Sequence, residues 1–414
     1  MVEIKLRKEV LLIVLVICTL SFGATVMERK VVIPEGGFDS YYLHSFSIFL
    51  TRDGKASILI DDLKHLFLYT QNNLKTVDID RKNNIFLNGF VENDHAMLAF
   101  VISPERYRYS GINIYDIQKG FGKPAAYIKI PIKLQDTPLG RLIPVPQMPG
   151  KYYILSNQET FLGVEAFTRC LGGGHISGYA KPYLAEINNG EISEYKKIKY
   201  GGKKYEDFNI KEYVSTVEMI HCLGLRHPKE HDGVLEPNSP VVLYYACYNP
   251  KEEQVVRSSN IYEIKSGPGS YKFGPLSLAV NDSNAFIVFS FHKYPFRGSP
   301  QNDIQKITSD IYYFQCDNNS TVNAVKIAKG FVPLVKLDSA GNVYVFWLDY
   351  NGNIVYKTKK DDRWSDERII LTGATMVSDV IFKKYFSVEF DEDNNLHVVF
   401  RTSEGIVYTK LKLE

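Results

Sequence analysis

Three segments near the C-terminal end of the chain repeat one pattern: an apolar run, a tight polar turn, and a second run that alternates with period two. The segments are residues 280–289 (VNDSNAFIVF), 337–347 (LDSAGNVYVFW) and 390–400 (FDEDNNLHVVF). This pattern is typical of a β-hairpin inside a repeated sheet. The turn asparagines Asn284, Asn342 and Asn395 lie 58 and 53 residues apart. That spacing is too long for one hairpin and fits a four-stranded propeller blade with its loops.

The same hairpin pattern recurs along the rest of the chain. Inner strands are expected to start near Ser45, Ile85, Lys151, Val214, Leu276, Val332 and Phe386. We therefore predict an all-β fold, a seven-bladed β-propeller, with six or eight blades as the neighbouring counts. The alternative is a β-sandwich or two smaller β-domains, but no linker, charge run or change of composition divides the chain in two.

The last predicted blade has one strand too few. After Phe386 the sequence contains three strand-like runs before Glu414. Residues 30–33 (KVVI) are predicted to supply the fourth strand, which closes the ring and removes the free edges that an open sheet would expose. Residues 25–414 are accordingly expected to form one domain.

Residues 1–24 have the composition of a signal peptide. Lys5, Arg7 and Lys8 precede an apolar run over residues 10–20, and the small residues Gly23 and Ala24 suit cleavage. The run is short for a bilayer span. Export to an extracellular, periplasmic or cell-surface location is therefore predicted. Two alternatives are a lipoprotein at Cys18, although Ile17 is larger than a lipobox residue at that position, and an uncleaved signal anchor, the one case in which a membrane would be a partner.

Composition agrees with an all-β chain and excludes one class of partner. The 28 Tyr and 24 Phe suit a pleated, half-buried surface. The formal net charge is +2 with both signs mixed, and such a chain has no basic field for nucleic acid.

Four cysteines follow the signal segment: Cys170, Cys222, Cys247 and Cys316. An even number in an exported protein allows two disulfides, whereas the expected strand placement favours buried reduced thiols. A CLGxxH pattern starts at Cys170 and again at Cys222, and two Cys with two His are a zinc set by type. Because the two copies are expected on opposite faces, we predict no metal site and no cofactor.

Loops between second and third strands open at one mouth of a propeller channel and are unusually rich in Arg and aromatic residues here. The guanidinium fork of Arg suits carboxylates, and aromatic rings suit stacking, so an anionic or hydroxyl-rich ligand is predicted at this mouth. The alternative is that these are ordinary polar surface loops. The candidate ligand-binding residues are Arg106, Tyr107, Arg169, His175, Tyr179, His292, Tyr294, Arg297 and Arg401.

Residues 332–370 resemble a blade of the sialidase-like, BNR-type β-propellers found in secreted glycan-active and glycan-binding proteins. The resemblance is clearest over residues 276–414, and residues 359–364 keep the Asp and the Trp of the Asp box of that family. It implies a secreted propeller whose ligands are glycans.

Three functions are compatible with this sequence. The first is binding of a polysaccharide or glycoconjugate at the channel mouth, without catalysis. The second is a carbohydrate-active enzyme: a sialidase-like glycosidase, which needs two facing carboxylates, or a polysaccharide lyase, for which His175, Tyr179 and His292 are candidate bases. The third is an adhesion or scaffold module that binds a surface protein, because fold alone does not decide function.

Overall fold

The structure is a computed structural model. It describes residues 24–38, 45–62, 65–70, 73–80, 83–104, 109–131, 141–160, 179–194, 196–198, 207–227, 241–264, 270–281, 284–294, 307–317, 323–360, 362–375 and 386–414. Within these ranges the regular elements are all β-strands, which confirms the predicted all-β class. No helix among these residues is long and apolar enough to cross a bilayer.

The first three groups of strands come from the N-terminal half of the chain. One sheet contains β2 (Ser45–Leu50), β3 (Ala56–Asp61), β4 (Leu66–Thr70) and β5 (Asn73–Thr76). The next group contains β6 (Asn84–Glu92), β7 (His95–Ile102), β8 (Gly111–Asp116) and β9 (Ala126–Lys129). The third contains β10 (Arg141–Pro144), β11 (Lys151–Thr160), β12 (Tyr179–Asn188), β13 (Glu191–Ile192) and β14 (Lys196–Lys197).

The remaining groups follow in chain order. One sheet contains β15 (Asp207–Ser215), β16 (Ile220–His227), β17 (Val241–Asn249) and β18 (Gln254–Ile264). The next contains β19 (Ser270–Val280), β20 (Ala285–Tyr294), β21 (Thr308–Cys316) and β22 (Val325–Lys329). Another contains β23 (Phe331–Leu337), β24 (Val343–Leu348), β25 (Ile354–Lys360), β26 (Arg363–Trp364) and β27 (Arg368–Leu371). The last contains β28 (Phe386–Phe390), β29 (Asn395–Thr402), β30 (Gly405–Leu413) and β1 (Ala24–Pro34).

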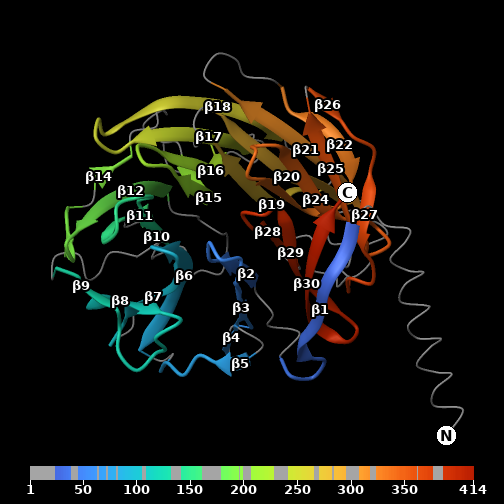
Figure 1. The fold of residues 1–414 in the computed structure, drawn as a ribbon. Coiled ribbons are helices and arrows are strands. Elements are labelled where there is room, and N and C mark those ends of the chain that lie inside the picture. The colour runs from blue at the N-terminus through green and yellow to red at the C-terminus, as the bar shows by residue number, and fades with distance from the viewer. Residues whose placement is uncertain are drawn as a thin grey trace, which may run out of the picture.

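The second and third groups are joined into one nine-stranded sheet by a single parallel pair, Glu191 with Lys129. We interpret them as separate blades and refer to the groups as blades 1 to 7 in the order given. The sheets stand around a ring, with first strands such as β2, β19 and β28 toward its centre and fourth strands such as β5 and β18 outside (Figure 1). Along the ring, β28 packs against β2, β2 against β6, and β6 against β10.

The ring closes as the sequence predicts. Strand β1 pairs antiparallel with β30 from Ala24 opposite Leu413 to Pro34 opposite Gly405, so blade 7 is built from both ends of the chain (Figure 1). The closing strand is longer than residues 30–33. The predicted signal segment is residues 1–24, and only Ala24 of this segment is among the described residues.

Two predicted inner strands are wrong. Lys151 opens β11, the second strand of blade 3, because the four-residue β10 already lies inside it. Val214 lies near the end of β15, whose first half (DFNIK) is too polar to resemble a buried strand. Cys222 accordingly lies within the second strand of blade 4, and Cys247 within the third.

The repeated turn pattern has a direct structural cause. In blade 6 the Asp338 carboxylate accepts hydrogen bonds from the backbone N–H and the side-chain amide of Asn342, both at 2.8 Å. In blade 7 the Asp391 carboxylate does the same with Asn395, at 2.8 Å to the backbone nitrogen and 3.0 Å to the amide nitrogen. Each carboxylate satisfies turn donors locally and fixes a tight hairpin between the first and second strands.

Candidate functional site

The predicted loop-face residues are only partly within the described ranges. Tyr179 is the first residue of β12 and Tyr294 the last of β20, but their side chains lie outside the description. The candidates that fall wholly outside the described residues are Arg106, Tyr107, Arg169, His175 and Arg297.

His292 is not at a ligand-accessible surface. Its side chain is fully buried, its Nε2 lies 3.3 Å from the Ser290 hydroxyl, and its ring stacks on Phe331 of the next blade at 6.0 Å between centroids. The ring also packs so closely on Gly274 that an added Cβ there would lie 2.2 Å from Nε2. Strand alternation turns His292 into the space between blades 5 and 6, so its side chain is not exposed at the predicted mouth.

Arg401 is also buried, with 8% of its surface exposed. Its Nη2 lies 3.4 Å from the Glu35 carboxylate, and its guanidinium lies 5.4 Å from the centroid of the Phe38 ring. Glu35 and Phe38 belong to the chain that leads from blade 7 into blade 1. Arg401 therefore contacts the segment that leads from blade 7 into blade 1, and its side chain is largely covered rather than exposed at the predicted mouth.

Two carboxylates in the turns between second and third strands, Asp349 and Glu404, are engaged within the protein. Asp349 accepts hydrogen bonds from the backbone and side chain of Asn353, both at 2.8 Å, and so repeats the turn geometry of blade 6 on the other face. Glu404 lies 3.2 Å from Arg29 of β1. The segment of residues 248–257 connects the third and fourth strands of blade 4, so Arg257 lies on β18 and not in a loop of this face.

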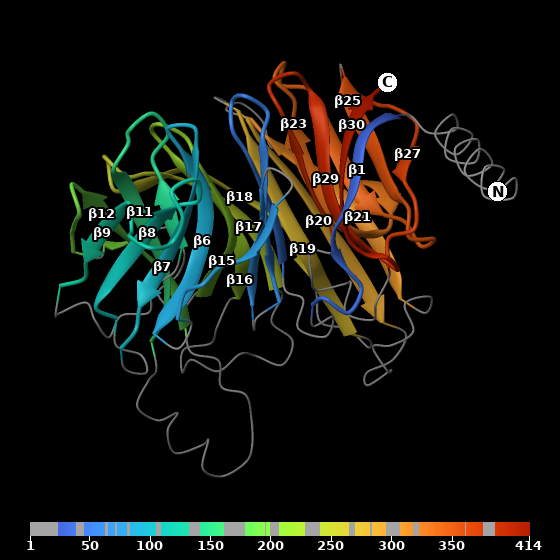
Figure 2. The ribbon, with the colours of Figure 1, turned by 60° about the horizontal axis from the view of Figure 1, so that its bottom comes forward.

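A cavity of about 330 Å³ lies at the opposite end of the channel, where the first strands of four blades turn into the second. We call it the turn-face cavity; the turns that form it stand along the upper edge of Figure 2. Its apolar wall is Leu50, Val91 and Phe390. Its polar residues are Thr51, Arg52, Asn93, Asp94, Gln147, Asp391 and Glu392.

Local backbone conformation explains why polar residues stand at these turns. Asn93, Asp94 and Gln147 have φ values of 50°, 65° and 62°. Asn and Asp tolerate this left-handed region better than other residues with a Cβ. The hairpins are therefore tight, and their side chains gather where the inner strands end.

Neighbouring turns are tied together around the turn-face cavity. Between blades 1 and 2, the Asp94 carboxylate accepts a hydrogen bond from the backbone N–H of Arg52. Between blades 2 and 3, the Glu92 carboxylate accepts hydrogen bonds from the Gly150 N–H at 3.0 Å and the Tyr152 hydroxyl at 2.8 Å. These bonds fix the relative positions of the turns, so the cavity is preorganised by three blades.

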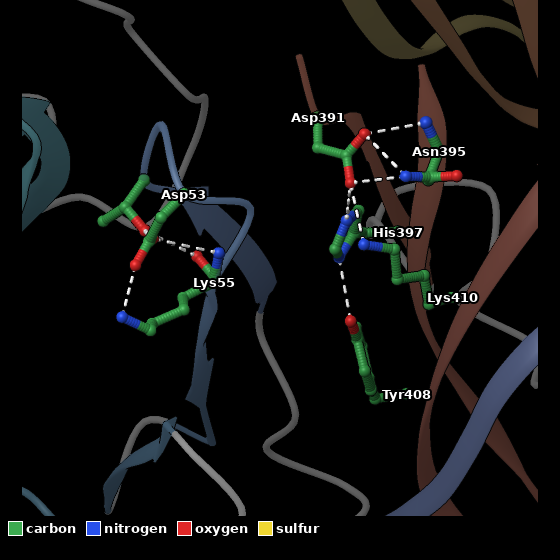
Figure 3. A network of polar contacts seen from close by, with 8 residues as sticks. Asp53, Lys55, Asp391, Asn395, His397, Tyr408 and Lys410 are labelled. Atoms are coloured by element: carbon green, nitrogen blue, oxygen red, sulfur yellow. Dashed lines mark hydrogen bonds and ion pairs between the residues drawn. The ribbon is translucent and has the colours of Figure 1, made fainter. Parts of the chain in front are cut away.

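The contact between blades 7 and 1 involves a buried carboxylate. Gly54, at a φ of +73°, lies beside Asp391, and a Cβ added there would be in ordinary van der Waals contact with Oδ2 at 3.6 Å. Asp391 Oδ2 in turn lies 2.9 Å from Lys410 Nζ and 3.1 Å from His397 Nε2, and His397 Nδ1 lies 2.8 Å from the Tyr408 hydroxyl (Figure 3). A chain of polar contacts therefore runs from the cavity wall into blade 7.

The protonation states in this chain follow from burial. Burial pushes the pKa of Asp391 upward, but hydrogen bonds from Lys410, Asn395 and His397 outweigh it and hold the pKa below its usual range. Burial lowers the pKa of His397, although the Asp391 hydrogen bond opposes this shift. The imidazole is therefore neutral, with Nε2–H donating to Asp391 and Nδ1 accepting from Tyr408. An anionic, fully engaged Asp391 does not serve as a general acid.

The carboxylates at the turn-face cavity differ in how far other residues of the protein already engage them. Hydrolysis of a glycoside needs two carboxylates, one of them protonated at working pH. Asp391 is anionic and engaged by Lys410, Asn395 and His397, Asp94 accepts the Arg52 N–H through one oxygen, and Glu392 also lines the cavity. Among the described residues no group of three or more His, Cys, Asp or Glu could hold a metal. The described cysteines, Cys222, Cys247 and Cys316, are buried and unbridged; Cys170 lies outside the description.

Sequence reasoning missed the residues of this cavity. The sequence predicted a site in the loops rich in Arg, whereas Arg52, Asn93 and Gln147 lie in short hairpin turns whose sequences indicate only a turn. One clue was present: the Asn93-Asp94 pair between alternating runs predicts a two-residue hairpin turn with left-handed residues. That clue locates each turn but not the cavity that several turns form together.

Comparisons with known proteins show the fold alone. No protein-family model and no curated protein sequence matches the chain. Among solved structures, a polysaccharide lyase superposes with a TM-score of 0.52 and 9% identity, over 94% of each chain. A chain from the mitotic checkpoint complex has a TM-score of 0.51 and 8% identity, over 95% of this chain and 96% of that one. Together with the ring of antiparallel sheets, these likenesses identify an all-β propeller.

Proposed function

We propose that this protein is an exported, non-catalytic β-propeller that binds a glycan, and that the turn-face cavity holds the sugar. The observation that carries this proposal is the cavity itself. Its volume of about 330 Å³ lies at the lower end of the range of small-molecule sites, roughly 300 to 1,000 Å³. A site of this size accommodates one or two sugar rings.

The composition of the cavity wall supports a sugar as the ligand. Phe390, Leu50 and Val91 offer apolar surface for the C–H face of a ring, while the amides of Asn93 and Gln147 can both donate and accept hydrogen bonds to hydroxyl groups. A hydroxyl-rich molecule with one apolar face matches this mixture. The polysaccharide lyase with the same fold is a carbohydrate-active protein, which is consistent with the proposal.

The loop face is proposed as a second contact region for a longer glycan. Its proposed residues are Arg106, Tyr107, Arg169, His175, Tyr179, Tyr294 and Arg297. A surface protein as partner, an enzyme of the lyase type and a membrane-anchored form are the competing outcomes of the experiment below.

The test is binding of the intact protein to a broad glycan panel, with hits measured by titration calorimetry. Asn93→Gly and Gln147→Gly remove polar side chains without straining their left-handed backbone. We expect each to weaken binding about fivefold or more, as the loss of one or two hydrogen bonds implies. Asn189→Gly is the matched control, since Asn189 is exposed, has a φ of 51° and does not line the cavity.

Absence of any glycan hit, together with capture of an envelope protein that sugar does not displace, would replace this proposal with the scaffold function. An increase in ultraviolet absorbance on uronate polymers would show lyase activity instead. Equal loss of binding in Asn189→Gly and Asn93→Gly would show that the turn-face cavity is not the site.

A further inference from the structure

We infer that the turn-face cavity selects a sugar that bears a free amino group over neutral or acidic sugars. This inference rests on the proposed function and specifies its ligand class. It differs from the ligand expected at the loop face, where Arg side chains predict an anion. Some charges at the cavity are already compensated within the protein, and those that are not decide which ligand fits.

The Asp391 charge is compensated. Its side chain is 2% exposed, and Lys410 Nζ lies 2.9 Å from it. Nearby Asp53 and Lys55 form their own ion pair and do not line the cavity (Figure 3). These two pairs therefore add little net charge to the site, although Lys55 also interacts electrostatically with Asp94.

The charges that remain at the cavity wall are those of Asp94, Glu392 and Arg52. Two carboxylates against one guanidinium leave the wall negative. Asp94 is held in place because it accepts the hydrogen bond from the Arg52 backbone N–H, so its carboxylate is fixed before any ligand arrives. Glu392 directly follows Asp391, whose position the ion pair with Lys410 fixes. The Asp94 carboxylate is therefore held in place by the fold, whereas Glu392 lines the cavity with an exposed side chain whose backbone alone is positioned.

A negative wall beside hydroxyl-binding amides matches an amino sugar. The ammonium group would donate hydrogen bonds to the Asp94 and Glu392 carboxylates, and charge-assisted bonds of this kind are the stronger ones. The remaining hydroxyls would meet the amides of Asn93 and Gln147. An acidic sugar would instead place its carboxylate beside two like charges. A unit charge about 4 Å away changes the affinity of a charged ligand roughly fivefold even in bulk water.

The experiment compares three oligosaccharides of equal length by titration calorimetry near pH 6 and low salt: a glucosamine tetramer, its N-acetylated form, and a galacturonate tetramer. We expect the free amine to bind about fivefold tighter than the N-acetylated form and the uronate to bind most weakly. Glu392→Gln and Asp94→Asn should each reduce this preference, and raising the salt concentration should reduce it as well. Asp94→Asn keeps the oxygen that accepts the Arg52 N–H.

Glu191→Gln is the matched control because it removes an exposed carboxylate on β13, outside the cavity. It should leave the preference for the free amine unchanged. Equal affinity for the amine and its N-acetylated form, or tighter binding of the uronate, would overturn the inference while glycan binding stands. A preference that survives both cavity variants would also overturn it. If none of the three binds while the broad panel gives a hit, the ligand class is wrong; if the panel is also silent, glycan binding itself fails.

Discussion

Blades 4 and 7 bury the same pair of side chains in the same register. In blade 4, His221 on the second strand stands opposite Cys247, and its Nδ1 lies 2.7 Å from the hydroxyl of Tyr245 on the third strand. In blade 7, His397 stands opposite Lys410, and its Nδ1 lies 2.8 Å from the Tyr408 hydroxyl. Each Tyr precedes the residue opposite the His by two positions, so the two pairs are equivalent diagonals across a strand pair.

The two blades differ in the third member of the contact. In blade 4, Arg257 of the outer strand donates to the Tyr245 hydroxyl at 3.2 Å. In blade 7, Asp391 accepts from the imidazole and connects it to the wall of the turn-face cavity. An Asp–His–Tyr chain beside a cavity resembles a catalytic relay. In blade 4 the same His–Tyr pair contacts Arg257 instead and does not line the cavity. The buried His–Tyr pair is therefore a structural feature that both blades share, and only blade 7 adds Asp391 to it.

The largest difference expected between the two blades concerns how each is completed. Blade 4 is one continuous segment, whereas blade 7 needs β1, in which Val32 and Ile33 are buried. A chain that begins at Thr25 should fold, and one that begins at Ser40 should not. Each hydrogen bond lost between β1 and β30 costs about 0.5 to 1.5 kcal/mol, and together with the lost burial of Val32 and Ile33 the sum reaches the stability of a typical domain, about 5 to 15 kcal/mol.

Thermal unfolding followed by circular dichroism measures this effect on both chains. The chain that begins at Thr25 is the control, since it loses the segment before β1 and keeps all but the first residue of the strand. Equal melting temperatures would show that the ring closes in another way and that β1 is dispensable.

The next largest effect is expected at Asp391. Asp391→Ala leaves the Lys410 ammonium and the His397 Nε2–H without their acceptor, at a cost of about 3 kcal/mol for a broken, largely buried ion pair. In blade 4, Tyr245→Phe removes one buried hydroxyl and should cost about 1 to 2 kcal/mol. Urea denaturation measures both variants. If Tyr245→Phe were the costlier change, the carboxylate would not be what distinguishes blade 7.

The sequence predicts these two blades unequally well. In blade 7 the turn at Asp391 follows from Asx-turn chemistry, which acts within a few residues, and ring closure follows from the count of only three strand-like runs after Phe386. The start of blade 4 does not, because β15 is an inner strand with a polar first half. The turn-face cavity does not either: Thr51 and Glu392 meet there only after the ring has closed. Turn residues are predictable, but a site shared by four blades is a property of the assembled ring.

A third prediction uses pH to separate the two histidines. Burial, with a contribution from Arg257, lowers the pKa of His221 to about 4. The unfolded chain, with a pKa of about 6.5, therefore binds more protons below pH 6.5 than the folded chain. Stability is fully present above that pH and is lost as the pH falls toward 4, by about 2 kcal/mol between pH 6.5 and 4.5 for this one group.

Urea unfolding of the wild-type protein and of His221→Phe across that range measures the contribution. We expect a shallower loss of stability in the variant, whatever its stability at neutral pH. His397→Phe should flatten the curve less, because the Asp391 hydrogen bond opposes the lowering of the His397 pKa. Parallel curves of stability against pH for the wild type and His221→Phe would show that the pKa of His221 in the folded protein is not lower than in the unfolded chain.

The smallest effects are expected where single hydrogen bonds link each blade to the one before it. In blade 7, Asn394 Oδ1 accepts the Ser339 N–H of blade 6 at 2.9 Å on an exposed turn; in blade 4, the half-buried Ser215 hydroxyl donates to the Pro144 carbonyl of blade 3 at 2.7 Å. Water replaces the exposed bond more readily, so Asn394→Gly should cost about 0.5 kcal/mol and Ser215→Ala about 1 kcal/mol. Glycine tolerates the Asn394 φ of 60°, and Asn189→Gly in the same urea titrations corrects for its added chain entropy. If Asn394→Gly lowered the free energy of unfolding more than Ser215→Ala, blade 7 would depend on its turn contacts more than blade 4 does. Asn394 would then contribute to the ring closure alongside the Asp391 carboxylate.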